Sequence, residues 1–412
     1  MKRIAKLTGI LLIVLGLTVP ITTTQAQLKQ QQDESYEKFG RDIDIQYLKQ
    51  YDRTGNNIFE MPMETDIEYE GFKIQWGASF RQQWQTLTQD NNITDPSSDS
   101  YLPELGPGFN TANANLYLDA QVADGMLVHV FTYLSSRHHR EAWVKGGYLQ
   151  IDKFAMIDMP LLDALMKNLR VKFGHYEVNY GDQHYRRSDN ALTTYNPFMS
   201  NLIMDPFATE IGAEFQYINN GFLGTVQLTG GEIAGDVTNE ETRAVSWIGK
   251  LGYDNMYSSN FNPDGLRFRL TGSIYTTAKS NFNTIYFGDR AGSHYFGVID
   301  PGLDTDAEND FSGRFNPGLH DEVTSFMVNP YVKYRGLELF GTIETTSGTG
   351  FDQNFNGERD VQQYAVEAVY YLFPNDNVSI GARWNKVDGE NAFTNNDVEI
   401  TRFQVAGTWY IT

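Results

Sequence analysis

The sequence predicts an all-β fold, a transmembrane antiparallel β-barrel of 14–16 strands with short periplasmic turns and long external loops. Three observations predict it. Apolar and polar residues alternate with period two in many segments. The connections between these segments alternate between short and long, as in outer-membrane barrels. The polar faces also carry too many charges for a dry core, so they are expected to face water inside the barrel.

The N-terminus reads as a secretory signal. Lys2, Arg3 and Lys6 precede an apolar run of ten residues at 10–19, and small residues at 24–26 suit cleavage before Gln27. The alternative, a membrane anchor, is disfavoured because a spanning helix needs about 20 apolar residues. We therefore expect 1–26 to be a signal peptide. Its removal takes three positive charges from a chain of 412 residues and net charge −20, leaving 386 residues and −23.

Residues 27–66 differ from the rest of the chain. They are rich in Gln and charged residues and poor in aliphatic ones. We expect a periplasmic N-terminal tail here, ahead of a barrel over 67–412. The sequence leaves open whether this tail is a disordered linker or a folded plug.

The strand pattern begins at Phe72. Phe72, Ile74 and Trp76 alternate with Lys73 and Gln75, so one face is apolar and the other polar. Most such segments have the roughly 9–11 residues that a spanning strand needs. The fourteen predicted strands are 72–84, 112–122, 126–136, 143–153, 169–175, 208–218, 222–231, 243–253, 266–277, 323–335, 337–346, 361–373, 377–387 and 398–411.

The connections decide between a soluble and a membrane barrel. Tight turns are predicted at 123–125, 219–221, 336 and 374–376, and long loops at 88–111, 178–207, 278–322, 347–360 and 388–397. All long loops fall on one side, as in outer-membrane barrels. Two connections on the short-turn side, 154–168 and 254–264, are longer than the tight turns expected there. A further hairpin within 282–300 would raise the count to sixteen.

Aromatic residues on the apolar faces gather toward strand ends, where lipid headgroups lie. The residues expected to face outward in this way are Trp76, Trp84, Phe215, Phe268, Tyr364, Tyr370, Trp384 and Trp409.

The opposite faces are assigned to the inner wall. Their basic residues are expected to line a pore and outnumber the acidic ones by ten to five, which predicts a preference for anions. The alternative is that these charges pair across neighbouring strands and leave no net field. The basic residues are Lys73, Arg81, Arg170, Lys172, Lys250, Arg267, Arg269, Lys333, Arg383 and Arg402. The acidic ones are Asp119, Glu214, Glu338, Glu344 and Glu367. Arg267 is expected to be solvated, so that Arg267→Glu would change ion preference at little expense of stability.

The loop at 178–207 is aromatic and contains two prolines flanked by Phe198 and Phe207. Such a loop is poorly suited to protrude into water, so we expect it to fold into the lumen as a constriction loop. Arg186, Arg187 and Asp189 are its candidate pore residues. The alternative is packing at a subunit interface.

Composition excludes several classes. The absence of Cys removes disulfide scaffolds, thiol enzymes and Cys-ligated metals. The acidic balance argues against nucleic acid as a partner. The 24 Tyr, 26 Phe and 6 Trp argue against disorder.

No strong catalytic or metal motif is present. Asp182 and His184 could form an acid–base pair, but no nucleophile or second carboxylate stands beside them in sequence. His138 and His139 are adjacent, so on a strand they would point in opposite directions. Residues 352–357 begin like a calcium loop, yet the twelfth position is Gln363. We expect no enzymatic activity, no cofactor and no bound metal.

Two motifs resemble a known family. Residues 72–77 (FKIQWG) and 169–176 (LRVKFGHY), followed by Arg186-Arg187-Ser188-Asp189, resemble phosphate-selective porins of the porin O and P family. The resemblance covers 71–412 and implies a homotrimeric porin of sixteen strands with an inward-folded third loop. The chain departs from the pattern in lacking a dense Arg or Lys ladder and in ending with Trp409-Tyr410-Ile411-Thr412.

The expected function is therefore that of an outer-membrane porin for passive diffusion of small hydrophilic solutes, including anions. The alternative is a barrel subunit or anchor of an envelope complex without open-channel activity. The expected partners are outer-membrane lipids and small solutes, and the expected location is the outer membrane of a Gram-negative type cell.

Overall fold

The computed structural model describes residues 44–135, 142–188, 192–233, 242–286, 296–299, 310–311, 313–350, 357–372, 376–390 and 397–411. All elements described below belong to one compact unit. The predicted signal peptide lies outside the described residues. Among the described residues, no helix is both long enough and apolar enough to cross a membrane.

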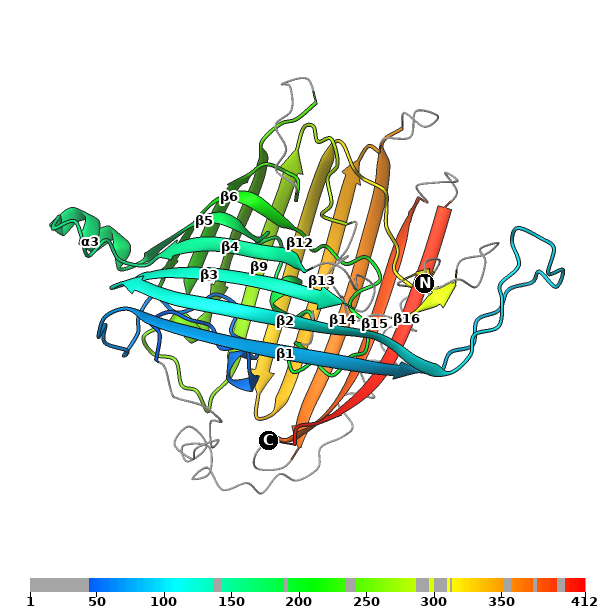
Figure 1. Ribbon diagram of the computed structural model, residues 1–412, viewed down its shortest axis with the longest axis horizontal. Coiled ribbons are helices and arrows are strands. Elements are labelled where there is room, and N and C mark those ends of the chain that lie inside the picture. The colour runs from blue at the N-terminus through cyan, green and yellow to red at the C-terminus, as the bar shows by residue number, and fades with distance from the viewer. Residues whose placement is uncertain are drawn as a thin grey trace, which may run out of the picture. The chain divides into compact units, whose positions relative to one another are not determined.

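Fourteen antiparallel strands form one sheet, and each strand pairs with its neighbours in the chain (Figure 1). This confirms the predicted fold class, and each strand coincides with one of the fourteen predicted segments. The strands are β1 (Lys73–Gln85), β2 (Gly108–Ala123), β3 (Met126–Ser135), β4 (Trp143–Ile151), β5 (Leu169–Glu177), β6 (Thr209–Asn219), β7 (Phe222–Thr229), β8 (Ser246–Asp254), β9 (Arg267–Thr277), β12 (Val323–Tyr334), β13 (Leu337–Gly348), β14 (Arg359–Leu372), β15 (Val378–Glu390) and β16 (Asp397–Trp409).

The further hairpin considered within 282–300 does not add strands to this sheet in the described part of the chain. Instead β10 (Val298–Ile299) and β11 (Asp310–Phe311) pair with each other in a separate two-stranded sheet.

Helices are short and few among the described residues: η1 (Arg53–Gly55), α3 (Pro160–Met166), α4 (Gln183–Arg186) and η3 (Asn255–Tyr257). Helix α3 lies in the long connection between β4 and β5. Its first residue is Pro160, a position where the missing N–H is not needed. Helix η3 occupies the other long turn, between β8 and β9, and is capped by Asp254, whose side chain accepts a hydrogen bond from the backbone N–H of Met256 at 3.0 Å.

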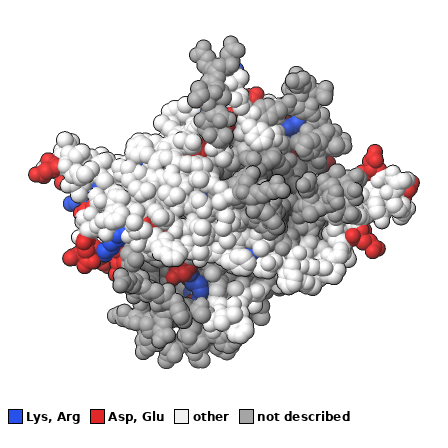
Figure 2. Space-filling model, in the orientation of Figure 1, with Lys and Arg blue, Asp and Glu red and all other residues white. Residues whose placement is uncertain are grey.

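The two faces of the sheet have opposite character. Trp76 and Trp409 are 79% and 70% exposed on the outside, whereas Arg269 and Glu214 are each 1% exposed on the inside. Figure 2 shows few charged side chains on the outer surface over the strands in that view. Seven of the eight predicted outward aromatics are exposed, and Tyr370 is half-buried. The reversal of the usual arrangement, apolar outside and polar inside, is what lipid on the outer face requires.

Two of the tight turns use left-handed backbone conformations. Asn220 and Gly221 have φ of 47° and 91°, and Arg335 and Gly336 have φ of 45° and 77°. Two consecutive positive φ values are typical of type I′ turns, which match the twist of the paired strands. These turns fix the register of β6 with β7 and of β12 with β13.

The pairing order begins at β1 and ends at β16. In the part of the chain described, no backbone pairing joins these two strands. Backbone groups cannot remain unpaired in hydrocarbon. Closure of this seam in a bilayer is therefore a prediction.

The space enclosed by the sheet is occupied by chain. The N-terminal segment 44–66 and the loop 178–207 both contact the inner face, and Phe198, Leu202, Ile203 and Met204 of the loop are fully buried. The backbone N–H of Ile203 donates to the Asn385 side chain of β15 at 2.6 Å. The two segments place acidic and aromatic side chains against the inner wall, where the candidate site lies.

Candidate functional site

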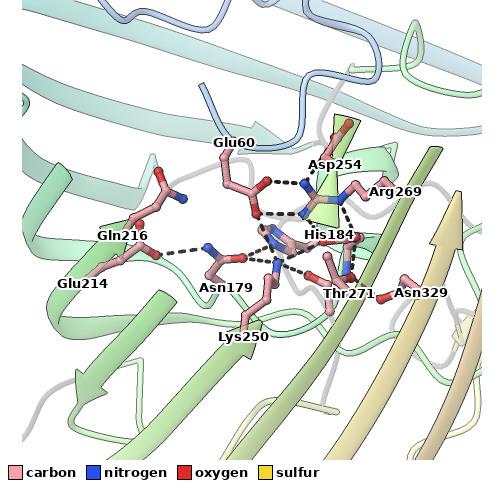
Figure 3. A network of polar contacts seen from close by, with 12 residues as sticks. Glu60, Asn179, His184, Glu214, Gln216, Lys250, Asp254, Arg269, Thr271 and Asn329 are labelled. Atoms are coloured by element: carbon pink, nitrogen blue, oxygen red, sulfur yellow. Dashed lines mark hydrogen bonds and ion pairs between the residues drawn. The ribbon is translucent and has the colours of Figure 1, made fainter. Parts of the chain in front are cut away.

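A network of charges joins the inner wall to the two segments inside it (Figure 3). Its centre is Arg269 of β9. The Arg269 guanidinium donates to Glu60 of the N-terminal segment at 2.6 and 2.9 Å and to Asp182 of the loop at 2.8 Å twice. Bidentate pairs of this kind are the strongest and most directional of protein ion pairs. One wall residue therefore holds both segments.

Lys250 of β8 provides the second cation. Its ammonium lies 3.1 Å from Asp182 and 3.7 Å from Glu60, donates to the Gly181 carbonyl at 2.6 Å, and contacts the Asn179 side chain. Thr271 donates to Asp182 at 2.6 Å. Two buried cations thus face two buried carboxylates.

Burial alone would raise the pKa of the Asp182 carboxyl, but Arg269 and Lys250 beside it hold that pKa well below its ordinary value. The same opposition acts on Glu60, where burial raises the pKa and Arg269 and Lys250 lower it more. Both carboxylates are therefore ionised at neutral pH.

Phe59 explains why the N-terminal segment enters this position. Its ring is 1% exposed and packs with Tyr331 and Phe340 of the wall. The Arg269 guanidinium lies 4.4 Å from the ring centroid, a cation–π distance. Phe59 therefore packs against aromatic rings of the wall, while the adjacent Glu60 binds the Arg269 guanidinium beside those rings.

Asn57 adds a second attachment. It donates to Glu338 of β13 at 2.6 Å and accepts a hydrogen bond from Arg186 of the loop. Its backbone carbonyl accepts from Arg267 at 2.7 Å. The described part of the tail, 44–66, is therefore folded against the inner wall as a plug.

Eight of the ten predicted wall cations form ion pairs with carboxylates: Lys73 with Glu70, Arg170 with Asp152, Lys172 with Glu214, Lys250 with Asp182, Arg267 with Asp254, Arg269 with Glu60, Lys333 with Glu338, and Arg383 with Glu367. Arg402 donates to Ser200 and to the carbonyls of Asn201 and Gly313, and Arg81 is buried. The residues lie on the inner side, and their role in lining a pore remains a prediction.

The expectation that Arg267 is solvated is wrong. Its side chain is only 7% exposed, and its guanidinium donates to both oxygens of Asp254, at 3.1 and 2.7 Å. The plug covers it, because the Asn57 carbonyl occupies its remaining donor.

The loop arginines are also engaged. Arg186 lies 3.5 Å from Glu338 and 3.7 Å from Glu367. Arg187 donates to Asp205 of the same loop at 2.8 Å and stacks 4.0 Å from the Phe207 ring centroid. Asp189 lies outside the described residues.

Space remains on one side of the lumen. A cavity of about 190 Å³ lies between the inner face of β2–β6, the plug and the loop. Its walls carry five cations, Lys49, Lys145, Arg170, Lys172 and Arg187, against three carboxylates, Glu60, Glu177 and Glu214. Six of the seven tyrosines around it come from the plug, β4, β5 and the loop: Tyr47, Tyr51, Tyr148, Tyr176, Tyr185 and Tyr195.

The other side of the lumen is filled. Ile203 and Met204 of the loop join a buried apolar cluster with Tyr275 of β9, Met327 of β12 and Val361 of β14. The described cavity therefore lies on the side of β2–β6, away from this apolar cluster.

The acid–base pair considered at Asp182 and His184 is absent. Asp182 is bound to Arg269, while His184 contacts Glu177 at 3.1 Å and Asn179 at 3.1 Å. Among the described residues, no group of three or more His, Asp or Glu side chains is arranged to hold a metal ion. His138, His139 and 352–356 lie outside the described residues.

Sequence reasoning missed the plug residues Asn57, Phe59 and Glu60. They lie in a segment without strand periodicity, and their partners are up to 281 positions away. Phe59-Glu60 is an aromatic–acidic pair, but Tyr36-Glu37 and Tyr51-Asp52 in the same tail have the same pattern, so the pattern alone does not select it.

Fold and site together define a class: a membrane-spanning antiparallel β-barrel of the outer-membrane type, whose lumen holds a plug, a folded-in loop and a lateral cavity. No family model matches the sequence, and no curated protein matches it.

Solved structures with detectable likeness include OmpT, an outer membrane protein of Vibrio cholerae, at 11% identity over 84% of each chain with a TM-score of 0.45. OmpF of Salmonella typhi, solved in complex with daunomycin, is 12% identical over 82% of this chain and 97% of its own, with a TM-score of 0.37. The outer membrane channel DcaP of Acinetobacter baumannii is 10% identical over 83% and 98%, with a TM-score of 0.37.

Proposed function

We propose that the chain is an outer-membrane channel for passive diffusion of small hydrophilic solutes. The observation that carries this proposal is the cavity of about 190 Å³, lined by charged and aromatic side chains, between the inner wall and the plug. A barrel that served only as an anchor would have no need of an unfilled, charged space on one side of its lumen. The apolar outer face with its exposed aromatics supports the membrane setting.

We further propose a modest preference for anions that originates in the cavity. Ion pairs compensate most of the wall cations, so the wall as a whole supplies little net field. At the cavity, Arg170, Lys172 and Arg187 are likewise paired with Asp152, Glu214 and Asp205. The proposed preference therefore rests chiefly on Lys49, which acts at short range, whereas charges on the outer loops are screened beyond about 10 Å at 0.1 M salt. Phosphate selectivity and a homotrimer, which the porin O and P resemblance implies, have no support beyond that resemblance.

A second candidate function is supported by the filled half of the lumen. The plug and loop are held by buried ion pairs at Arg269, which favours a barrel subunit or anchor that conducts little at rest. The two candidates differ in one measurable property, ion conduction by the purified protein.

Single-channel recording in planar bilayers tests the choice. A channel gives reproducible current steps, and swelling of proteoliposomes in small sugars would accompany them. Reversal potentials across a KCl gradient then report selectivity. Current steps that appear only after deletion of 44–66 would favour the anchor, with the plug closing the lumen.

A further inference from the structure

Three residues that line the cavity carry a polar group without a hydrogen-bond or ion-pair partner in the part of the chain that the structure describes. The Lys49 ammonium lies 5.3 Å from the Tyr185 ring centroid and 4.9 Å from that of Tyr195, and no carboxylate is within ion-pair distance of it. The Tyr176 hydroxyl and the Asn115 side-chain oxygen make no hydrogen bond.

The last two groups are deeply buried. Tyr176 and Asn115 are each 2% exposed. Leaving a buried polar group unpaired costs about 1–3 kcal/mol, so such groups are normally satisfied by water or by a bound molecule. The three groups come from three elements, the plug, β5 and β2, and all border the same cavity.

Their chemistry specifies a complementary molecule. A half-buried ammonium between two aromatic rings favours an anionic group. A tyrosine hydroxyl can donate or accept, and an amide oxygen accepts, so both suit the hydroxyls of a solute. The stacked rings of Tyr51 and Tyr117, 3.9 Å apart, and the Tyr148 ring add apolar faces to the same wall.

Volume limits the size. Pockets for drug-sized ligands hold about 300–1,000 Å³, so a cavity of about 190 Å³ suits a molecule no larger than a single sugar ring. Much of the cavity wall is the apolar surface of aromatic rings. A bare inorganic ion would make no favourable contact with most of that surface.

We propose that this cavity is a binding site for a hydroxylated carboxylate of monosaccharide size. Lys49 binds the carboxylate, and the Tyr176 hydroxyl and the Asn115 amide oxygen bind the hydroxyls, while the tyrosine rings contact the apolar edges of the solute. This inference rests on the proposed channel function, because it names the class of solute that the channel would carry. Binding at the site requires only that the solute reaches the cavity.

The test uses the whole protein in detergent micelles, with D-glucuronate as the probe, glucose as its neutral counterpart and acetate as the anion without hydroxyls. Isothermal titration measures binding directly. In bilayers, glucuronate block of KCl current measures binding inside the conducting pathway. We expect glucuronate to bind at least tenfold more tightly than either counterpart, because each lacks one half of the contacts.

Two variants examine the contacts. Lys49→Met removes the ammonium and keeps an apolar stem, and Tyr176→Phe removes only a hydroxyl. We expect a loss of affinity of about 10-fold or more for Lys49→Met and several-fold for Tyr176→Phe. Lys167→Met is the matched control, because Lys167 is exposed beside α3 and the substitution changes the net charge equally. It should leave affinity unchanged.

The outcomes separate the site from the channel. Wild-type protein that conducts KCl but binds glucuronate no better than glucose and acetate overturns the site and leaves the channel. Protein that binds glucuronate by titration yet never conducts overturns the channel and leaves the site. Equal losses for Lys49→Met and Lys167→Met also overturn the site, because overall charge would then explain the binding.

Discussion

Arg269 on the inner wall and Glu60 in the N-terminal segment form a two-point ion pair at 2.6 and 2.9 Å, although 209 positions separate them in the chain. Both side chains are fully buried. A buried pair of this kind holds its two segments together strongly, because neither charge can be left alone in a low-dielectric interior. The pair therefore fixes the plug to the barrel.

Replacing Glu60 by Gln should release the plug. Removal of one partner from a buried ion pair costs up to about 3–5 kcal/mol, and Asp182, which stays bound to Arg269, lessens that loss here. We expect faster protease cleavage within 44–66 and larger single-channel current. Glu64→Gln is the matched control, since Glu64 is exposed in the same segment. Equal behaviour of the two variants would show that the pair does not hold the plug.

Replacing Arg267 by Glu should be strongly destabilising. The new carboxylate would face Asp254, which Arg267 now neutralises at 2.7 Å. A like-charge buried pair in place of an ion pair should cost several kcal/mol, measured by urea unfolding in micelles. Arg335→Glu is the control, because Arg335 is exposed in the turn between β12 and β13. An Arg267→Glu loss below about 1 kcal/mol would show that water reaches this position.

Binding of glucuronate should weaken as pH rises from 7 to 9. Burial lowers the pKa of the Lys49 ammonium from its usual value to about 8, and the negative charges of Glu177 and Glu60 limit the decrease. Lys49 is therefore charged at pH 7 and mostly neutral at pH 9, while the solute carboxylate stays ionised. We expect about a tenfold loss of affinity across this interval.

The other groups that face Lys49 should not titrate in the same interval. Burial raises the pKa of Tyr185 and of Tyr195 far above the usual value for tyrosine. Burial also lowers the pKa of His184, which is therefore neutral throughout. Glu60 keeps its negative charge, because Arg269 and Lys250 lower the pKa of its carboxyl more than burial raises it. In Lys49→Met the pH dependence should disappear, and its persistence would assign the titration to another group.

The seam between β1 and β16 should be closed in a bilayer. Their outer edges carry unpaired backbone N–H and C=O groups in the described residues, and hydrocarbon does not tolerate these. Hydrogen exchange of the protein in lipid nanodiscs should therefore show β1 and β16 protected as strongly as β8 and β9. Fast exchange confined to β1 and β16 would establish an open seam.

The strands could be predicted from the sequence because a strand is a local pattern. If Lys73 and Gln75 face water, then Phe72, Ile74 and Trp76 must face lipid. The same alternation of polar and apolar residues recurs in the neighbouring segments. The turn at Asn220-Gly221 is equally local, since it depends on two residues that tolerate positive φ.

The site could be predicted only in part. The side on which Arg267 and Arg269 lie follows from the alternation, but their partners do not. Glu60 and Asp254 are separated from them by 209 and 13 positions, and nothing in the alternation selects either one. The cavity was also beyond reach, because it is the volume left by the plug and the loop after both have packed.

The strictly sequential order of the strands has a consequence for how the molecule assembles. Each strand of the sheet pairs with the strands that precede and follow it in the sheet's chain order, so the sheet can grow one strand at a time, and doubling the length of a connecting loop adds only about 0.6 kcal/mol to its closure. The segment 44–66 is synthesised before all of them, yet its binding surface on β8, β9 and β13 exists only after most of the sheet has formed. The first part of the described chain to be made is therefore among the last to reach its place. A machinery that inserts this barrel must keep that segment unengaged until β13, the eleventh strand of the sheet, is in position.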